Sequence, residues 1–462
     1  MKKKFKVIYS SLPENKFFQT SSVEMGNLPD ENENGIINIF EDIKYQEILG
    51  FGGAFTESAA YNYALMSDKN KKLFLKSYFD DKNGIGYNFG RTHINSCDFS
   101  LGIYSYVKEG DTTLETFDID RDRKYIIPFI KDAMKYSSEL ILFASPWSPP
   151  AYMKDSYDVV KGGKLLPEYK STWAHYYAKY IKAFKEEGIN ISAISVQNEP
   201  MAIQPWESCT YTAEEEADFI ENYLIPALDE EGLSDIKIII WDHNKERVFD
   251  RARDVLRSEI LKERVWAVGF HWYSGEHFEG LKLVHEVLDK PTILTEFCSG
   301  IYISSDSYEK IAENYAIEVC EDINNYCIGI CDWNLLLNKY GGPFHNRTAS
   351  STVGNRNKAV NDPMEGGCAS PILYDEENDK LIFTPAYYYM GHFSKYIKRG
   401  ARRLAVTKYL KKIFGSAFEN PDGSRVAVVV NTNDILEKVA IRYMGKSTLI
   451  NLGPHSIATI LI

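Results

Sequence analysis

The stretch ISAISVQNEP, residues 191–200, decides the fold. Its first half is short, apolar and flanked by polar residues, which is typical of a buried strand. It then ends in Asn198 and Glu199, where a glycine or serine would turn the chain more easily. A buried strand that carries a carboxylate at its carboxyl end is the arrangement found at the rim of a parallel barrel.

The same pattern recurs seven more times along the chain. We expect strands at residues 47–55, 87–95, 139–147, 191–199, 236–244, 265–273, 292–297 and 327–335. Helix-like segments separate them, such as residues 167–188, which begin with proline and end with glycine. Eight strand–helix units predict an α/β fold, a (β/α)8 TIM barrel. A doubly wound open sheet is the alternative, but GFGGAFTESA after the first strand contains no GxGxxG.

The 462 residues exceed what one hydrophobic core usually holds, so a second, smaller unit is expected. From about residue 393 the chain alternates in strand fashion, with NPDGS and NLGPHS as turns. The first residues also contain strand-like stretches, KFKVIYSS and GIINIF. We therefore predict a barrel over residues 46–392 and an appended antiparallel β-sandwich built from both termini, residues 1–45 and 393–462.

Composition argues against several classes of partner. The net charge of −12 disfavours binding to nucleic acid or anionic lipid, and no apolar run reaches membrane-spanning length, so no stable membrane insertion is expected. The basic start MKKKFK is not followed by the apolar core of a signal peptide. The seven cysteines are scattered without a CxxC pair, which indicates neither a disulfide framework nor a zinc site. These features predict a cytoplasmic protein.

Polar side chains gather at the predicted carboxyl ends of the strands, where a barrel places its active site. Glu199 and Glu296 follow strands four and seven, so they face each other across the barrel mouth. Two neighbouring carboxyls separate into an acid and a nucleophile or base, as glycosidic bond cleavage requires. One glutamate alone could be a mere ion-pair partner, but the pair with Asn198, His271 and Tyr273 beside it indicates catalysis.

An ordered set of motifs then points to a known family. Over most of its length the chain resembles glycoside hydrolase family 30, the glucosylceramidase-like enzymes. The motifs that carry this resemblance are GFGGAFTESAA, NSCDFS, LFASPWSPPAYMK, VQNEP, PWESCTYTAEEE, HWY, LTEF, WNLLLNKYGGP and YYYMGHFSKYI. The resemblance implies a (β/α)8 barrel packed on a β-sandwich from both termini, in agreement with the strand pattern.

The resemblance also implies roles for individual residues. Glu199 of QNEP would be the general acid/base and Glu296 of LTEF the nucleophile of a retaining double displacement through a covalent glycosyl-enzyme. The substrate-binding residues that it implies are Asn198 at the sugar 2-hydroxyl, Tyr273 holding the nucleophile, His271 on the same wall, Asp98 and Trp147 at the sugar hydroxyls, and Trp333 beneath the ring.

Four further expectations concern the surroundings of this site. Arg91 should support a carboxylate and not touch the substrate. Trp206 of QPWES should form a platform for the leaving group. Asp242 and His243 have no third ligand at matching spacing, so neither a metal nor another cofactor is expected. The chain departs from the family after WNLLLNKYGGP, where residues 341–380 predict a long loop that shapes the substrate entrance through His345 and Asn346.

The sequence therefore predicts a retaining β-glycosidase that hydrolyses β-D-glucosides or short β-linked oligosaccharides. β-Xylosidase, β-galactosidase, β-fucosidase and endo-β-1,6-glucanase activities remain open, because a few hydroxyl contacts decide among them. A non-catalytic carbohydrate-binding protein is the rival from another class, and the paired glutamates argue against it. A hydrolase that acts on glycolipids at a lipid surface is the second rival. The sequence contains no basic amphipathic segment to support such a membrane encounter.

Overall fold

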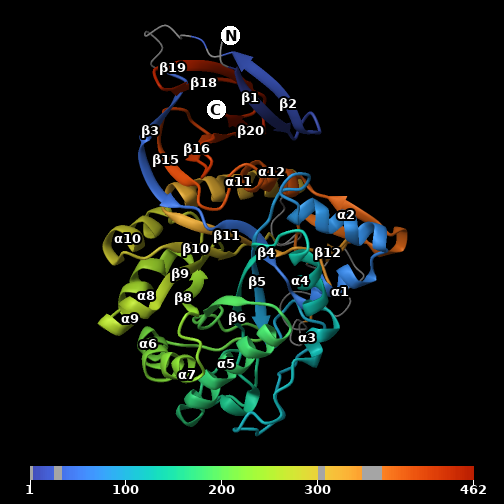
Figure 1. Cartoon of the computed structure of the whole chain (residues 1–462), viewed down its shortest axis with the longest axis vertical. Coiled ribbons are helices and arrows are strands. Elements are labelled where there is room, and N and C mark those ends of the chain that lie inside the picture. The colour runs from blue at the N-terminus through green and yellow to red at the C-terminus, as the bar shows by residue number, and fades with distance from the viewer. Residues whose placement is uncertain (1–3, 25, 27–33, 300–306, 346–366) are drawn as a thin grey trace.

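The computed structural model describes residues 4–24, 26, 34–299, 307–345 and 367–462. Figure 1 shows a barrel with its helices in the lower part and a sheet above it, where both ends of the chain lie. This sheet is antiparallel except for one parallel strand pair. This confirms the predicted fold class, a TIM barrel with an appended β-domain formed by both termini. Within the described part of the chain, every helix is too short or too polar to cross a membrane.

Eight parallel strands close the barrel, and each lies inside the stretch predicted for it. Strand pairing follows the order of the chain around the ring, and β11 closes it by pairing with β4. The strands are β4 (Gly50–Ala54), β5 (Phe89–Ile94), β6 (Ile141–Pro146), β7 (Ile191–Ser195), β8 (Lys237–Asn244), β9 (Val265–His271), β10 (Thr292–Glu296) and β11 (Cys327–Asn334).

The barrel strands are mostly apolar because both of their faces are covered. A layer of inward-facing side chains fills the interior: Phe89, Phe143, Ala193, Ile239, Ala267, Ile293 and Cys331. Close packing also explains one glycine of β4. A Cβ on Gly52 would lie 1.4 Å from the carbonyl oxygen of Phe89, so only glycine allows β4 and β5 to approach this closely.

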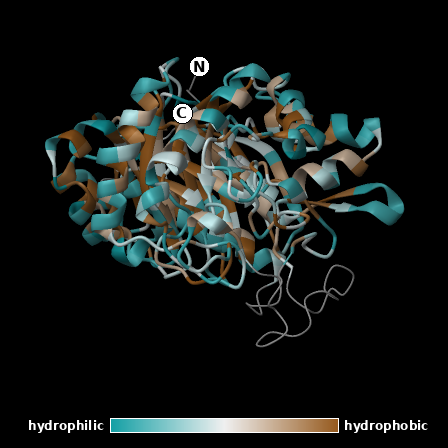
Figure 2. Cartoon of the chain, turned by 90° about the horizontal axis from the view of Figure 1, so that it is seen from below, coloured by the Kyte–Doolittle hydropathy of each residue, from teal (hydrophilic) through white to brown (hydrophobic). Residues whose placement is uncertain are grey.

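Helices surround the barrel, and Figure 2 shows apolar strands at the centre with hydrophilic helix surfaces around them. Capping side chains start several of them: Ser67 accepts from the Asn70 amide at α2, and Thr212 and Glu215 form a capping box at α6. The helices are α1 (Glu57–Leu65), α2 (Asp68–Phe79), α3 (Asp120–Lys124), α4 (Ile126–Met134), α5 (Lys170–Glu186), α6 (Ala213–Phe219), α7 (Ile225–Glu230), α8 (Val248–Val255), α9 (Glu259–Arg264), α10 (Phe278–Leu288), α11 (Tyr308–Asn324) and α12 (Pro385–Ser394).

Short helical turns complete this layer. Four are 3-10 turns, and a π-helical turn joins α6 to α7. They are η1 (Ala151–Met153), η2 (Pro167–Tyr169), the π-turn η3 (Ile220–Leu224), η4 (Lys245–Arg247) and η5 (Glu376–Asn378).

The appended domain is one nine-stranded sheet in the order β19-β18-β3-β15-β16-β17-β20-β1-β2. It curls until its two edges meet, because Thr448 Oγ1 in β19 donates to the Glu24 carbonyl in β2 at 3.0 Å. Its strands are β1 (Lys4–Ser11), β2 (Lys16–Glu24), β3 (Ile36–Glu47), β15 (Arg402–Lys408), β16 (Ile413–Glu419), β17 (Arg425–Asn431), β18 (Glu437–Tyr443), β19 (Lys446–Leu452) and β20 (Ser456–Leu461).

The sheet shares a core with the barrel. Along β17, Val428 and Val430 belong to the large core of the barrel and its helices, whereas Ala427 and Val429 face the core inside the curled sheet. This alternation follows from the two-residue period of a strand. Helix α12 lies in the interface, where its buried His392 bonds to side chains of both β1 and β20.

A small third sheet corrects one prediction. Residues 341–380 were expected to form a long loop, but the described part of this stretch contains β13 (Ile372–Asp375) and the start of β14 (Lys380–Phe383). These strands pair antiparallel, and β12 (Leu337–Asn338) joins β13 in parallel. Their apolar residues flank the polar run EEND, residues 376–379, which forms the turn between the strands and made the whole segment look irregular. Asn346 lies outside the described residues.

Candidate active site

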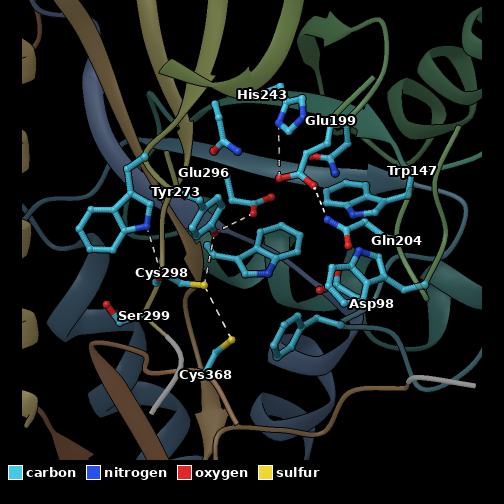
Figure 3. A pocket seen from close by; sticks show the side chains of 16 residues that line it. Asp98, Trp147, Glu199, Gln204, His243, Tyr273, Glu296, Cys298, Ser299 and Cys368 are labelled. Carbon is cyan, nitrogen blue, oxygen red and sulfur yellow. Dashed lines mark hydrogen bonds and ion pairs between the residues drawn. The ribbon is translucent and has the colours of Figure 1, made fainter. Parts of the chain in front are cut away.

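A pocket of about 500 Å³ opens at the carboxyl ends of the barrel strands. Figure 3 shows side chains from several strands and loops converging on it. The lining residues are Asp98, Phe99, Trp147, Asn198, Glu199, Gln204, Trp206, His243, Asn244, Trp272, Tyr273, Glu296, Cys298, Ser299, Trp333 and Cys368. Both predicted catalytic carboxyls are among them.

Glu296, the last residue of β10, is 7% exposed and held on both of its oxygens. Arg91 Nη1 donates to Oε2 at 2.7 Å, and the Tyr273 hydroxyl donates to Oε1 at 2.9 Å. Burial raises the pKa of Glu296, while His271 and Arg91 oppose that rise. The guanidinium favours the ionised carboxylate at neutral pH, and the raised pKa makes that carboxylate a stronger nucleophile.

Glu199 lies four residues beyond the end of β7, with a positive φ of 49°. Its backbone amide donates to the carbonyl of Asp242, which also has a positive φ, of 50°. Its carboxylate accepts from Gln204 Nε2 at 3.2 Å and lies 3.2 Å from His271 Nδ1. Burial would raise the pKa of Glu199, but His271, His243 and Gln204 outweigh it and lower the pKa to about 2.

His271 links the two glutamates from behind the pocket. Its Nδ1 lies 3.2 Å from Glu199 and 4.0 Å from Glu296, and its Nε2 lies 3.0 Å from Asp242. Burial lowers the pKa of His271, but these three carboxylates raise it to about 9. The imidazolium therefore holds a proton one hydrogen bond away from Glu199. The side chain is fully buried and does not line the pocket, unlike the substrate contact expected from the sequence.

Arg91 occupies the supporting position that the sequence suggested. Besides Glu296, its guanidinium donates to Asn198 Oδ1 at 2.8 Å and to Asp242 Oδ2 at 2.9 Å. It lies against the ring of Trp147, 4.7 Å from the centroid. Because Asn198 Oδ1 accepts from Arg91, the amide nitrogen of Asn198 remains to donate into the pocket.

The remaining wall suits a sugar ring. Trp147 and Trp333 stack on each other with centroids 5.1 Å apart, and both line the pocket together with Trp206. Asp98 Oδ1 is buried without a hydrogen-bond partner. Burial, with Glu296 and Glu207 nearby, raises the pKa of Asp98 well above its ordinary value. An unpartnered carboxyl oxygen in a pocket is available to a ligand hydroxyl.

His345 was expected to shape the substrate entrance, but the structure places it elsewhere. Its Nε2 lies 3.0 Å from Glu207, its Nδ1 lies 2.9 Å from the Ser100 carbonyl, and its amide donates to the Asp98 carbonyl at 3.0 Å. It does not line the pocket. The structure therefore makes His345 a brace for the loop that carries Asp98.

Sequence reasoning missed several lining residues: Phe99, Gln204, Trp272, Cys298, Ser299 and Cys368. All follow strands or lie in loops, where no periodic signal marks the side that faces the pocket. Gln204 could have been found from its place in the loop after Glu199. Cys368 comes from a segment far along the chain, and nothing in the sequence places it beside Cys298.

One group of side chains in the described residues has the spacing of a metal site. Ligand atoms of Glu199, His243 and His271 lie within 4.8 Å of one another. His243 Nδ1 is buried and makes no hydrogen bond, whereas His271 and Glu199 already bond to each other. The expectation that the site uses no metal stays a prediction.

The chain matches two domains of one protein family. The glycosyl hydrolase family 30 TIM-barrel domain matches residues 48–397, and the beta sandwich domain of the same family matches residues 400–460. The chain belongs to glycoside hydrolase family 30. It is a glycoside hydrolase, and its substrates are carbohydrates.

Three similar proteins show how far the likeness extends. The chain is 32% identical to lysosomal acid glucosylceramidase of Mus musculus, over 86% of this chain and 77% of that protein. The crystal structure of SrfJ from Salmonella typhimurium superposes with a TM-score of 0.92 at 34% identity, covering 100% of this chain and 99% of that one. The endo-beta1,6-glucanase BT3312 superposes with a TM-score of 0.85 at 26% identity, covering 99% of both chains.

Proposed function

We propose that this family 30 enzyme is a retaining β-glycosidase that hydrolyses β-D-glucosides or short β-linked oligosaccharides. The observation that carries the proposal is the shared histidine: carboxylate oxygens of Glu199 and Glu296 both lie within 4.0 Å of His271 Nδ1. Such proximity is compatible with the separation of about 5 Å between the two carboxyl groups of a retaining site.

In the first step Glu296 attacks the anomeric carbon while Glu199 protonates the departing glycosidic oxygen. Arg91 and Tyr273 hold the two oxygens of Glu296, so one lone pair keeps a fixed direction towards the sugar. The amide nitrogen of Asn198 donates to the 2-hydroxyl, a contact that strengthens as the oxocarbenium-like transition state forms.

The proton for this step comes through His271. The resting site holds Glu199 ionised and His271 protonated, with the two bonded at 3.2 Å. When a substrate oxygen lies against Glu199 and solvent is excluded, the ion pair of Glu199 and His271 is no longer favoured over the neutral pair. The proton then moves from His271 to the Glu199 carboxylate. Asp242 stays on the other nitrogen and keeps the ring in place.

In the second step Glu199 acts as a base. It takes a proton from a water that attacks the glycosyl–Glu296 ester on the face left by the leaving group. The sugar departs with its original β configuration, and Glu296 returns to its Arg91 and Tyr273 contacts.

The substrate class rests on the relatives and on the pocket. Two of the similar proteins are a glucosylceramidase and an endo-β-1,6-glucanase by name, and both names describe glucosyl linkages. Trp147, Trp333 and Trp206 line the pocket, and we assign the first two to the apolar face of the sugar ring and Trp206 to the leaving group. We also propose a cytoplasmic location, supported by seven unpaired thiols.

A panel of aryl β-glycosides tests the sugar: glucoside, xyloside, galactoside, fucoside and glucuronide. We expect the glucoside to be hydrolysed fastest. Proton NMR of the first product anomer tests the stereochemistry, and β-glucose appearing before mutarotation is expected. Glucosylceramide in micelles and a β-1,6-linked glucose oligosaccharide then test the leaving group.

Each outcome is decisive for one part of the proposal. An α-configured first product would overturn double displacement. A faster xyloside, galactoside or fucoside would replace the sugar assignment and leave the mechanism standing. Binding of glucose without hydrolysis of any substrate in the panel, the two natural classes included, would favour a carbohydrate-binding protein.

A further inference from the structure

Two cysteine thiols meet in the wall of the catalytic pocket. Cys298 lies two residues after Glu296, and its Sγ is 3.7 Å from the Sγ of Cys368 (Figure 3). Both side chains line the pocket, and Cys368 is half-buried. The other five cysteines are fully buried in the protein interior: Cys97, Cys209, Cys320, Cys327 and Cys331.

The backbones on either side hold this pair in register. The Ala369 amide donates to the Ser299 carbonyl at 2.7 Å, which joins the two segments directly beside the sulfurs. On the Cys298 side, Trp272 Nε1 donates to the Cys298 carbonyl at 3.1 Å. On the Cys368 side, its own amide donates to the Gly341 carbonyl at 3.1 Å. A disulfide has an S–S distance of about 2.05 Å, so side-chain rotation has to close a gap of roughly 1.7 Å.

The pair also touches the catalytic apparatus. Cys298 Sγ lies 3.4 Å from the Tyr273 hydroxyl, which in turn lies 2.9 Å from Glu296 Oε1. A phenol has one hydrogen, and Tyr273 uses it on Glu296. The Cys298 thiol likewise has one hydrogen, which it donates to Cys368 Sγ, so its sulfur only packs beside the hydroxyl that holds the nucleophile.

We propose that Cys298 and Cys368 are a modification site, where a reversible disulfide lowers the activity of the enzyme. The proposal rests on the function proposed above, since it concerns the same nucleophile. Oxidation removes the hydrogen that Cys298 donates to Cys368 and moves Cys298 Sγ towards Cys368, which disturbs its contact with the Tyr273 hydroxyl. Tyr273 then loses one of its two partners, and Glu296 is held less firmly.

With hydrogen peroxide as the oxidant the reaction balances in two steps. Contact with Cys368 and burial raise the pKa of Cys298, so the more accessible Cys368 reacts first. Its sulfur attacks one peroxide oxygen, the O–O bond breaks, and a sulfenic acid and one water form. The Cys298 sulfur then attacks the Cys368 sulfur, the S–O bond breaks, and the second water leaves with the remaining thiol proton. Two thiols have lost two electrons and two protons, and one peroxide has become two waters.

The test compares reduced and oxidised full-length enzyme. Protein reduced with dithiothreitol and freed of it is incubated with hydrogen peroxide and then with fresh dithiothreitol. At each stage kcat/KM on an aryl β-glucoside, the number of titratable thiols and the non-reduced peptide map are measured. The Cys368→Ser variant cannot form the bond yet keeps the thiol beside Tyr273. Cys209→Ser is the matched control, because Cys209 is a buried thiol outside the pocket. Each variant is compared with its own reduced form.

We expect a peptide pair linked through Cys298 and Cys368, two fewer titratable thiols, and a loss of at least about fivefold in kcat/KM that dithiothreitol restores. Cys209→Ser should respond like the wild type, and Cys368→Ser should keep its activity in peroxide. Cys368→Ala replaces the serine variant if that protein does not fold.

Three results would overturn the proposal. They are the absence of the linked peptide, a linked peptide with unchanged activity, and an equal activity loss in Cys368→Ser. The linked peptide and the thiol count do not depend on turnover. A reduced enzyme that is inactive on every glycoside would therefore count against the proposed function, while the disulfide is still tested by mass.

Discussion

At the scale of single residues, the two glutamates of the site differ in what surrounds them. Glu296 has fixed donors, Arg91 and Tyr273, on both oxygens, as suits a nucleophile that must point at one carbon. Glu199 is bonded to His271, the group from which we propose that it receives its proton. Glu199 and Asp242 both have a positive φ, and the Glu199 amide donates to the Asp242 carbonyl. Backbone strain therefore lies at the residue that we propose transfers the proton.

This difference predicts how the activities of the Glu199→Gln and Glu296→Gln variants depend on the substrate. Glu199→Gln should lower kcat/KM on alkyl or oligosaccharide substrates by about 10²-fold or more, and much less on 2,4-dinitrophenyl β-glucoside, which leaves without protonation. Glu296→Gln is the matched control and should abolish turnover of both kinds, because the covalent step needs the carboxylate. Equal losses on both substrate types in Glu199→Gln would remove its acid role.

His271 sets the expected alkaline limit of activity. Its pKa is raised to about 9, so the proton that Glu199 needs is present below that value and is lost as the pH rises through it. The pH profile of kcat/KM, which reports the free enzyme, should therefore fall with an apparent pKa of about 9. The ion pairs of His271 also stabilise the fold below its ordinary pKa of 6.5 and cease to do so above about 9.

His271→Asn checks that assignment. This variant should be slower at neutral pH and should lose the alkaline limb, because an asparagine side chain carries no titrating proton. A limb at about pH 9 that persists in the variant would assign the ionisation to another group.

At the scale of elements, one buried ion cluster joins the fifth barrel strand to the outer helices. Lys245, in η4 directly after β8, is fully buried and its Nζ lies 2.9 Å from Asp322 and in contact with Glu318, both on α11. Burial raises the pKa of Asp322 to about 6, although Lys245 and the hydrogen bond with Glu318 lower it. The cluster fixes α11 against the end of β8, the strand that also carries Asp242.

Removing the lysine should therefore cost stability more than chemistry. Lys245→Met leaves two buried carboxyls without their cation, and we expect the free energy of unfolding to fall by about 3–5 kcal/mol. Chemical denaturation measures it, and KM on the aryl glucoside should change little. Lys262→Met, which removes an exposed pair with Glu259 on α9, is the control and should leave the denaturation midpoint nearly unchanged.

Element by element, the sequence predicted the barrel well because the strands are largely apolar and polar residues lie at or just beyond most of their carboxyl ends. It failed where position depends on the finished fold. The hairpin of β13 and β14 was hidden by the charged turn between its strands. His271 and His345 were identified as important, but periodicity cannot show whether a histidine faces a ligand or a neighbouring carboxylate. The site residues contributed by distant loops, Cys368 among them, left no pattern to find.

At the scale of the whole molecule, the barrel and the sheet are parts of one structure. Val428, Val430 and Ile457 of the sheet are buried in the barrel's core, and His392 of α12 bonds to both β1 and β20. We predict a single cooperative unfolding transition, with equal calorimetric and van't Hoff enthalpies when unfolding is reversible. Two resolved transitions in differential scanning calorimetry would show that the sheet and the barrel unfold independently.

The pairing of N-terminal with C-terminal strands also has a consequence for folding during synthesis. Strand β1 pairs with β2 early but with β20 only late, and β3 pairs with β15 and β18, so these strands complete their sheet only when the late strands emerge from the ribosome. At about 5–20 residues per second that delay is roughly 20–90 s. Throughout it the apolar faces of β1 and β3 have no sheet to join. The growing chain therefore offers a chaperone its longest-lived binding site at the N-terminal end.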